Sequence, residues 1–306
     1  MEANRVAYGK ALAEIGQAND NVVVLDADLG KATNSIRFKA EFPERYIDCG
    51  IAEQNMIGIA AGLAASGKIP FASTFSVFVS MRAVEQLRNS VCYPELNVKV
   101  VGTHAGIECG GDGATHQAIE DLAITRSIPK LSVLVPADHV ATGKIVKLMA
   151  QHKGPMFMRV GRDANAALYD ENEEFVLGGS KQLRAGTDIT IMAIGSMVSK
   201  AIEAAKVLAG EGIEVRVLDM YSIKPIDKEA IVRAAKETKG IVTVEDHNVI
   251  GGLGSAVSEV VTSFEPTVVK KIGIQDCFGR SGESKELFAL YGLTVENIVK
   301  TVKEIS

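Results

Sequence analysis

Apolar and polar residues are grouped along the chain in blocks that predict strands and helices in turn. Four short runs in the first half are dense in Val, Leu, Ile and Met on both faces, as buried parallel strands are: residues 21–29, 97–104, 130–138 and 155–161. Helical spacing of apolar residues predicts helices around these runs: 5–16, 55–67, 80–91, 116–128 and 139–152. This alternation indicates an α/β fold built on a mostly parallel sheet.

The pattern changes after residue 165 and then starts again. Residues 166–187 are polar, acidic and glycine-bearing, which predicts a linker with at most a short strand or two. A second strand–helix alternation fills residues 188–306. We therefore predict two doubly wound, mostly parallel-sheet α/β domains, at 1–165 and 188–306.

Composition narrows the function classes. The chain has 306 residues, 47% of them hydrophobic, which is enough for two packed cores. A net charge of -5 argues against a nucleic-acid partner. The sequence shows neither a signal-peptide pattern nor an apolar run of about 18 residues, so we expect a cytoplasmic protein outside the membrane. The four cysteines lack a CxxC spacing and are expected to be buried free thiols.

Several polar residues follow predicted strands or precede predicted helices. Ligands of open α/β sheets gather at the carboxyl ends of the strands. The candidates are Asp26, Asp28, Glu53, His104, Asp112, His116 and Arg159. Each also has an ordinary structural explanation: Asp28 as a helix cap, Glu53 as an acid favoured by the helix dipole, His116 as a core histidine. Both explanations stay open at this point.

The segment THAGIECGGDGATHQ, residues 103–117, is rich in glycine and carries a histidine near each end. It suits a polar pocket loop better than a structural turn. Its His, Cys and Asp residues raise the possibility of a metal site. Their spacing matches no common zinc pattern, so we predict no metal ligands in this chain.

Long stretches of the sequence resemble transketolase. The runs GIAEQNMIGIAAGLAASGKIPFASTFSVFV, THAGIECGGDGATHQAIEDLAITRSIPKLSVLVPAD and PMFMRVGR are similar to its pyrimidine-binding domain. The later runs VEDHNVIGGLGSAVSEV and FGRSGESKELFALYGLTVENIV look like its C-terminal domain. The resemblance covers essentially the whole chain, but a complete transketolase has a further N-terminal domain.

That N-terminal domain holds the cofactor's diphosphate and metal through a GDG motif followed by an asparagine. Residues 111–113 read GDG, but the next asparagine is Asn165, which is too far away. The resemblance thus implies the C-terminal subunit of a split transketolase, which transfers a two-carbon ketol unit between sugar phosphates. It implies thiamin diphosphate and Mg²⁺, held mainly by a separate N-terminal subunit, and a homodimer of this chain within a heterotetramer.

The resemblance also implies roles for residues near the cofactor. Glu53 matches the glutamate that hydrogen-bonds N1′ of the cofactor's aminopyrimidine and helps to activate it. Phe75 and Phe78 match the aromatic residues that pack on this ring, although two phenylalanines three apart also suit an ordinary core. Met81 stands where many relatives have an aromatic residue, and it is the third residue expected at this ring, without an aromatic face.

On the substrate side, His116 and Asp112 match residues that contact the sugar hydroxyls, and His116 is the expected proton shuttle. His104, Arg5 and Arg159 match residues that hold the substrate's phosphate. Asp28 matches an acidic loop residue. The GKAT that follows Leu29 departs from the family pattern, so Thr33 or Ser35 would have to supply a phosphate-binding hydroxyl. We expect Glu245, Asp246 and His247, in the second half, to be structural or interface residues.

Two other enzymes and one non-catalytic function are alternatives to a split transketolase. The β subunit of a 2-oxo acid dehydrogenase is also a split chain, and 1-deoxyxylulose-5-phosphate synthase shares the architecture as a longer chain. A non-catalytic docking subunit is the alternative of another class.

Overall fold

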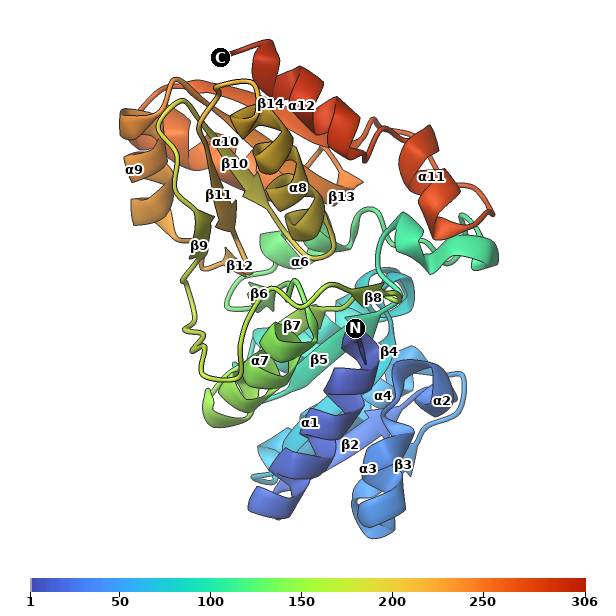
Figure 1. The fold of residues 1–306 in the computed structure, drawn as a ribbon. Coiled ribbons are helices and arrows are strands. Elements are labelled where there is room, and N and C mark those ends of the chain that lie inside the picture. Colours follow the sequence, from blue (N-terminus) through green and yellow to red (C-terminus); the bar gives the residue numbers. More distant parts are fainter. Residues whose placement is uncertain (1) are drawn as a thin grey trace.

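The computed structural model describes residues 2–306 and consists of two parallel-type sheets in series, each covered by helices (Figure 1). The first sheet has seven strands and the second has five. A short ribbon of β1 (Glu2–Ala3) and β8 (Ala164–Asn165) pairs the beginning of the chain with the end of its first half. The predicted α/β class with two mostly parallel sheets is confirmed.

In the first sheet, all neighbouring strands are parallel except the pair at one edge. Its strands, in spatial order, are β12 (Ser222–Lys224), β6 (Ser132–Leu134), β7 (Met156–Arg159), β5 (Lys99–Thr103), β4 (Ile69–Phe75), β2 (Val22–Asp26) and β3 (Tyr46–Asp48). The antiparallel strand β12 comes from the second half of the sequence, so the two halves share this sheet.

Alternate side chains of the interior strand β2 enter opposite cores. Val22 and Val24 belong to the core that contains Tyr8 of α1 (Asn4–Ala18), on the side also covered by α7 (His139–Gln151). Val23 and Leu25 belong to the other core, with Met56 of α4 (Glu53–Ala65). Helices therefore cover both faces, as continuous apolar strands require. Short helical elements of this half include α2 (Gly30–Thr33), α3 (Ile36–Glu41), η1 (Pro43–Arg45) and α6 (Asp121–Ser127).

Two features of the first half differ from the pattern-based prediction. The strand β4 lies in the middle of the sheet, but Pro70 near its start and small polar residues obscure its sequence signal. The helix expected at 80–91 is divided into a π-helical segment η2 (Phe78–Arg82), the turn α5 (Val84–Gln86) and a second π-helical segment η3 (Leu87–Cys92). Such segments are rare and frequently occur at functional sites.

The second sheet is also parallel except at one edge. Its strands, in spatial order, are β14 (Val268–Ile274), β13 (Gly240–Asn248), β10 (Ile189–Ala193), β11 (Val215–Asp219) and the antiparallel β9 (Lys181–Arg184). The strand β9 arises from the polar segment predicted as a linker. The helices of this half are α8 (Met197–Ala209), α9 (Lys228–Glu237), α10 (Leu253–Phe264), α11 (Ser284–Leu290) and α12 (Val295–Lys303).

A buried polar junction joins the two sheets, and Arg159 at the end of β7 is its central cation. The Arg159 side chain is only 6% exposed, and its Nε donates to the carboxylate of the fully buried Asp121 at 2.8 Å. Its terminal nitrogen donates to the backbone oxygens of Ala118, at 3.1 Å, and Asp246, at 2.7 Å. One guanidinium thus ties α6 to strand β13 of the second sheet.

The carboxylate of Asp246 fixes the beginning of η4 (Ile107–Asp112), which lies in the glycine-rich loop. It accepts the backbone N–H groups of Ile107, at 3.0 Å, and Glu108, at 3.3 Å. Gly106 has a φ of 71°, and a Cβ there would lie 2.0 Å from a carboxylate oxygen of Asp246. The close approach and the left-handed backbone both require glycine at this position.

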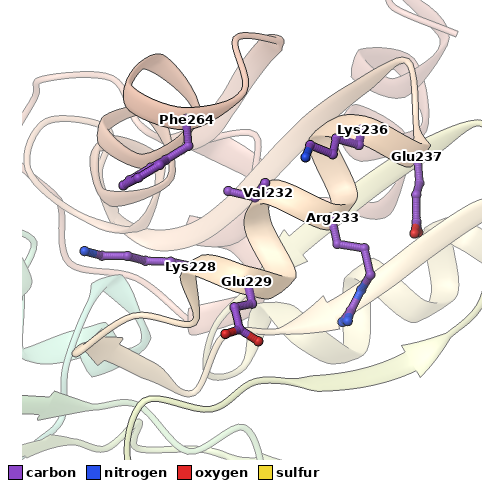
Figure 2. Close-up of a pocket in the computed structure, with 7 residues that line it drawn as sticks. All are labelled: Lys228, Glu229, Val232, Arg233, Lys236, Glu237 and Phe264. Atoms are coloured by element: carbon purple, nitrogen blue, oxygen red, sulfur yellow. The ribbon is translucent and has the colours of Figure 1, made fainter.

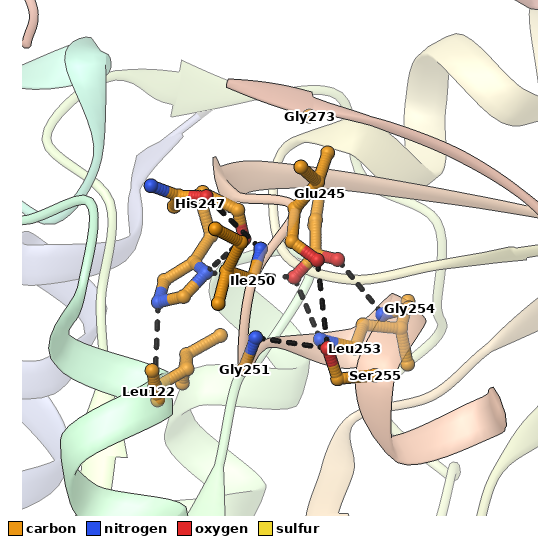
Figure 3. A network of polar contacts seen from close by, with 12 residues as sticks. Leu122, Glu245, His247, Ile250, Gly251, Leu253, Gly254, Ser255 and Gly273 are labelled. Carbon is orange, nitrogen blue, oxygen red and sulfur yellow. Dashed lines mark hydrogen bonds and ion pairs between the residues drawn. The ribbon is translucent and has the colours of Figure 1, made fainter. Parts of the chain in front are cut away.

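Glu245 and His247, on either side of Asp246 in β13, also make structural hydrogen bonds (Figure 3). Glu245 accepts the N–H groups of Leu253 and Gly254 and so caps the start of α10. His247 is fully buried, and its Nε2 accepts the N–H of Ala123 at 3.3 Å. Burial lowers the pKa of His247 to about 4, which keeps this ring neutral near pH 7. These contacts agree with the structural role expected from the sequence.

The cysteines are free thiols, but only Cys92 and Cys109 are buried, whereas Cys49 is half-buried and Cys277 is exposed. The expectation of four buried thiols is therefore wrong for Cys277, which lies in a surface loop after β14. Within residues 2–306, no helix has the length and apolar character needed to cross a membrane.

The junction makes a testable contribution to stability through Glu108. Burial raises the pKa of Glu108 to about 7, and the nearby Asp246 carboxylate adds to the rise. Between the unfolded pKa of about 4.3 and pH 7, the folded protein holds a proton here that the unfolded chain releases, so stability falls as pH rises through this window. We expect Glu108→Gln to remove this loss, on the order of 3 kcal/mol at most.

The measurement is urea unfolding at pH 5 and pH 8 for the wild type and Glu108→Gln. The matched control is Glu41→Gln, which changes an exposed surface acid. A pH dependence that is the same in Glu108→Gln and the wild type would show that this carboxyl does not titrate in the window.

Candidate active site

Glu53 is the first residue of α4, and its carboxylate is bound by an arginine. The side chain of Glu53 is 1% exposed, and NH1 of Arg82 donates to both carboxylate oxygens, at 2.9 and 2.8 Å. The guanidinium carbon of Arg82 also lies 4.6 Å from the centre of the Phe78 ring. The sequence analysis assigned no partner to Glu53 within this chain. The signal for Arg82 was the four-residue spacing of Phe78 and Arg82, which places both side chains on one helical face.

Two phenylalanines and two histidines gather next to this ion pair. The rings of Phe75 and Phe78 are nearly parallel, with centroids 5.8 Å apart. The ring of His104 stacks on Phe75 at 4.0 Å, and His116 meets Phe78 edge-on at 5.4 Å. Residues from β4, η2, the end of β5 and the glycine-rich loop thus form one cluster. Met81 lies in the same π-helical segment and is 43% exposed.

The backbone at His104 is strained, which is typical of functional positions. Its φ is 56°, in the left-handed region that non-glycine residues rarely adopt, and its Nδ1 is hydrogen-bonded to Thr103 Oγ1 at 3.0 Å. Burial lowers the pKa of His104 to about 4, with further lowering from the charges of Arg5 and Arg162. A neutral, partly constrained imidazole therefore faces the cluster at pH 7.

Arg5 and Arg162 form a cationic group beside His104. Nε of Arg5 donates to the backbone oxygen of Arg162 at 3.3 Å, and its NH1 donates to that of Ala32 at 3.0 Å. Arg162 donates to the backbone oxygen of Cys109 at 2.7 Å, and both arginines are only partly buried. Of these two arginines, only Arg5 is among the residues that the resemblance implies.

Arg159 is not part of this group, although the resemblance to transketolase implies that it binds the substrate's phosphate. Its hydrogen bonds go to Asp121 and to two backbone oxygens in the junction, and its side chain is 6% exposed. A phosphate could reach it only by replacing these contacts. The geometry therefore does not support the expected phosphate contact of Arg159, whereas Arg162, three residues later, is only partly buried.

The acidic candidates lie at the rim. Asp28 is exposed, has a φ of 60°, and its N–H donates to Asp48 at 3.1 Å. Asp112 is exposed at the end of η4. The hydroxyls of Thr33 and Ser35, considered as phosphate-binding groups, instead donate to the buried Asp26, at 3.0 and 2.8 Å.

Two surface hollows in the second half of the chain lie apart from the Glu53 cluster. One, of about 440 Å³, lies against α9 and the end of α10 (Figure 2), and its lining residues are Lys228, Glu229, Val232, Arg233, Lys236, Glu237 and Phe264. Another, of about 490 Å³, lies beside the exposed Cys277. Neither includes a residue of the Glu53 cluster, and both are wide surface depressions without convergent buried polar groups, so the cluster is the stronger candidate site.

Two transketolase family models match most of the chain. The family model for the transketolase pyrimidine-binding domain matches residues 2–166, and that for the transketolase C-terminal domain matches residues 178–298. A protein of Methanocaldococcus jannaschii assigned as a transketolase C-terminal section is 48% identical, over 98% of this chain and 95% of its own length. The 6-deoxy-6-sulfo-D-fructose transketolase subunit SqwH of Clostridium sp. (strain MSTE9) is 43% identical, over 99% of this chain and 94% of its own length.

A full-length transketolase and a solved split transketolase are also similar to this chain. Rat transketolase is 43% identical over 98% of this chain, but the match spans only 48% of the rat enzyme. A solved split gene transketolase, described as an inactive beta4 tetramer, superposes with a TM-score of 0.94 at 50% identity, covering 100% of this chain and 98% of its own. The chain therefore belongs to the transketolase family and comprises its pyrimidine-binding and C-terminal domains.

Proposed function

We propose that this chain is the C-terminal subunit of a split, thiamin diphosphate-dependent transketolase that transfers a two-carbon ketol unit between sugar phosphates. The observation that carries the proposal is the Glu53–Phe78–His116 cluster in a chain that matches two consecutive transketolase domains. Relatives of nearly the same length that are named as transketolase sections or subunits support a split enzyme.

The cluster fits the aminopyrimidine of thiamin diphosphate, which family membership implies as cofactor. The fit is supported by Arg82, whose planar, N–H-donating group lies over Phe78 and donates to Glu53. A flat nitrogen heterocycle can make the same two contacts. When bound, the cofactor supplies the carbanion chemistry of ketol transfer. Glu53 would hydrogen-bond N1′ and hold a proton there, and Phe75 and Phe78 would exclude water from the ring.

The remaining residues would act on the sugar. His116 lies edge-on to Phe78 and is half-buried, so it can move a proton at a substrate hydroxyl. Asp112, at the rim of the same loop, would accept hydrogen bonds from hydroxyls. Arg5, Arg162 and the neutral His104 would hold the phosphate, for which planar guanidinium groups are well suited.

The partner is proposed from relatives of nearly the same length that are named as a transketolase C-terminal section or subunit. Among residues 2–306 no cluster of His, Cys, Asp or Glu side chains suits a metal ion. We propose that a separate N-terminal subunit holds Mg²⁺ and the diphosphate, in a heterotetramer built on a homodimer of this chain. Domain limits of 1–165 and 188–306, a cytoplasmic location and sugar-phosphate metabolism stay predictions of the sequence.

The proposal is tested by measuring ketol transfer from xylulose 5-phosphate to ribose 5-phosphate with thiamin diphosphate and Mg²⁺. The chain is assayed alone and with the protein encoded next to it. We expect activity only in the mixture. Activity of the lone chain would contradict the split site. Turnover of 2-oxo acids instead would favour the dehydrogenase reading, and failure with all sugars and 2-oxo acids would favour a docking subunit.

Glu53→Gln is expected to reduce ketol transfer by the mixture about 10²-fold or more, because the amide cannot exchange a proton with the cofactor ring. The matched control is Glu41→Gln on the exposed end of α3. Wild-type rates in Glu53→Gln, with the cofactor bound, would remove the proposed role of this carboxyl.

Arg162→Ala is expected to raise the KM for xylulose 5-phosphate roughly 10- to 100-fold, the effect of losing a hydrogen bond to a charged group. The KM for hydroxypyruvate, which has no phosphate, should change much less. Arg233→Ala, on an exposed face of α9, is the control. Equal losses with both donors would argue against a phosphate contact.

A further inference from the structure

Arg82 occupies the position in which the proposed function requires the cofactor ring. Its NH1 group donates to both oxygens of Glu53, and its guanidinium plane lies near the Phe78 ring. These are the two contacts, a hydrogen bond to the carboxyl and packing on an aromatic face, that an aminopyrimidine would make. Arg82 is thus a cationic stand-in for the ring within the chain itself.

The two occupants exclude each other. The side chain of Glu53 is 1% exposed while Arg82 is paired with it, so a second donor from outside has no open approach to the carboxylate. The protonation states are also opposed. A guanidinium stabilises the ionised carboxylate, whereas donation of a proton to a ring nitrogen requires the protonated form. Binding of the ring at Glu53 therefore requires Arg82 to leave.

Arg82 can leave without disturbing the core. Its side chain is 49% exposed, in contrast to that of Glu53. It lies at the last residue of η2, and its contacts with Glu53 and Phe78 are both made by the guanidinium group. Turning the guanidinium into water would break one ion pair and one cation–π contact and would leave apolar packing in place.

We propose that Arg82 is an exchangeable plug of the cofactor site, which neutralises the buried Glu53 carboxylate in the unliganded chain and is displaced when an aminopyrimidine binds. This inference rests on the proposed function, because it takes Glu53 as the ring's partner. It adds that cofactor affinity is lowered by an internal competitor and that Arg82 does not hold the ring. It also explains how a buried carboxylate can be tolerated without ligand.

The test measures binding of 4-amino-5-hydroxymethyl-2-methylpyrimidine, the aminopyrimidine half of the cofactor, to the full chain. Binding is followed by calorimetry and by saturation-transfer NMR. We expect Arg82→Met, which keeps an apolar chain of similar length, to bind the probe roughly three- to tenfold more tightly, since a half-exposed ion pair and a cation–π contact no longer compete. Arg88→Met, at an exposed arginine of η3, is the control and should bind as the wild type does.

A second readout does not depend on the probe's affinity. Removing Arg82 leaves Glu53 buried without its cation, so Arg82→Met should lower the melting temperature of the unliganded chain more than Arg88→Met does. Arg82→Lys keeps a charge without the planar face and should fall between the wild type and Arg82→Met in both measurements. It also serves if Arg82→Met does not fold.

The outcomes distinguish the role of Arg82 as a plug from the role of Glu53 in binding the cofactor ring. Unchanged or weaker probe binding in both Arg82 variants, with binding lost in Glu53→Gln, would overturn the plug and leave the cofactor site in place. Binding that is tighter in the Arg82 variants and lost in Glu53→Gln supports the plug. Probe binding that ignores Glu53, or no binding to any variant, would overturn the cofactor assignment of Glu53 and the plug with it.

Discussion

The buried pair of Arg159 and Asp121 is the interaction on which the arrangement of the two sheets and the candidate site depends. Both side chains are almost completely withdrawn from water, and Arg159 also binds backbone oxygens of Ala118 and Asp246. Such a pair adds little net stability compared with apolar packing, but leaving one partner alone is very unfavourable. It therefore fixes geometry. The strand β7, the helix α6 and the strand β13 are linked by the contacts of this one guanidinium.

This arrangement immobilises a loop that its sequence would leave flexible. Residues 103–117 contain four glycines, yet η4 is held at its start by the Asp246 carboxylate. At the end of the loop, the amide of Gln117 donates to the backbone oxygen of Arg280 at 2.9 Å. Near the start of η4, Ser284 donates to the backbone oxygen of Glu108 at 3.2 Å. The second half of the chain therefore helps to position the loop that carries His116, through these hydrogen bonds.

Charge is distributed unevenly around the cluster. On one side the carboxylate of Glu53 is balanced by Arg82, and on the other Arg5 and Arg162 lie beside a histidine that burial and these charges keep neutral. An anionic group is favoured near the two arginines, whereas a flat nitrogen-bearing group is favoured near Glu53. The two ends of the cluster therefore suit chemically different ligand parts, with the rings of Phe75 and Phe78 nearby.

The sequence by itself determined the α/β alternation and the two mostly parallel sheets, because local periodicity carries that information. Its long ordered motifs also pointed to Glu53, Phe75, Phe78, His104 and His116, which the structure brings together in one cluster. Only the tertiary structure decided the central place of β4, whose Pro70 weakens its strand pattern, and the partnership of Glu53 with Arg82. It also separated two arginines three residues apart: Arg159 enters the junction between the sheets, whereas Arg162 lies beyond the strand beside Arg5. Side-chain direction and partners depend on which strands and loops become neighbours, and that is set by contacts between residues distant in the sequence.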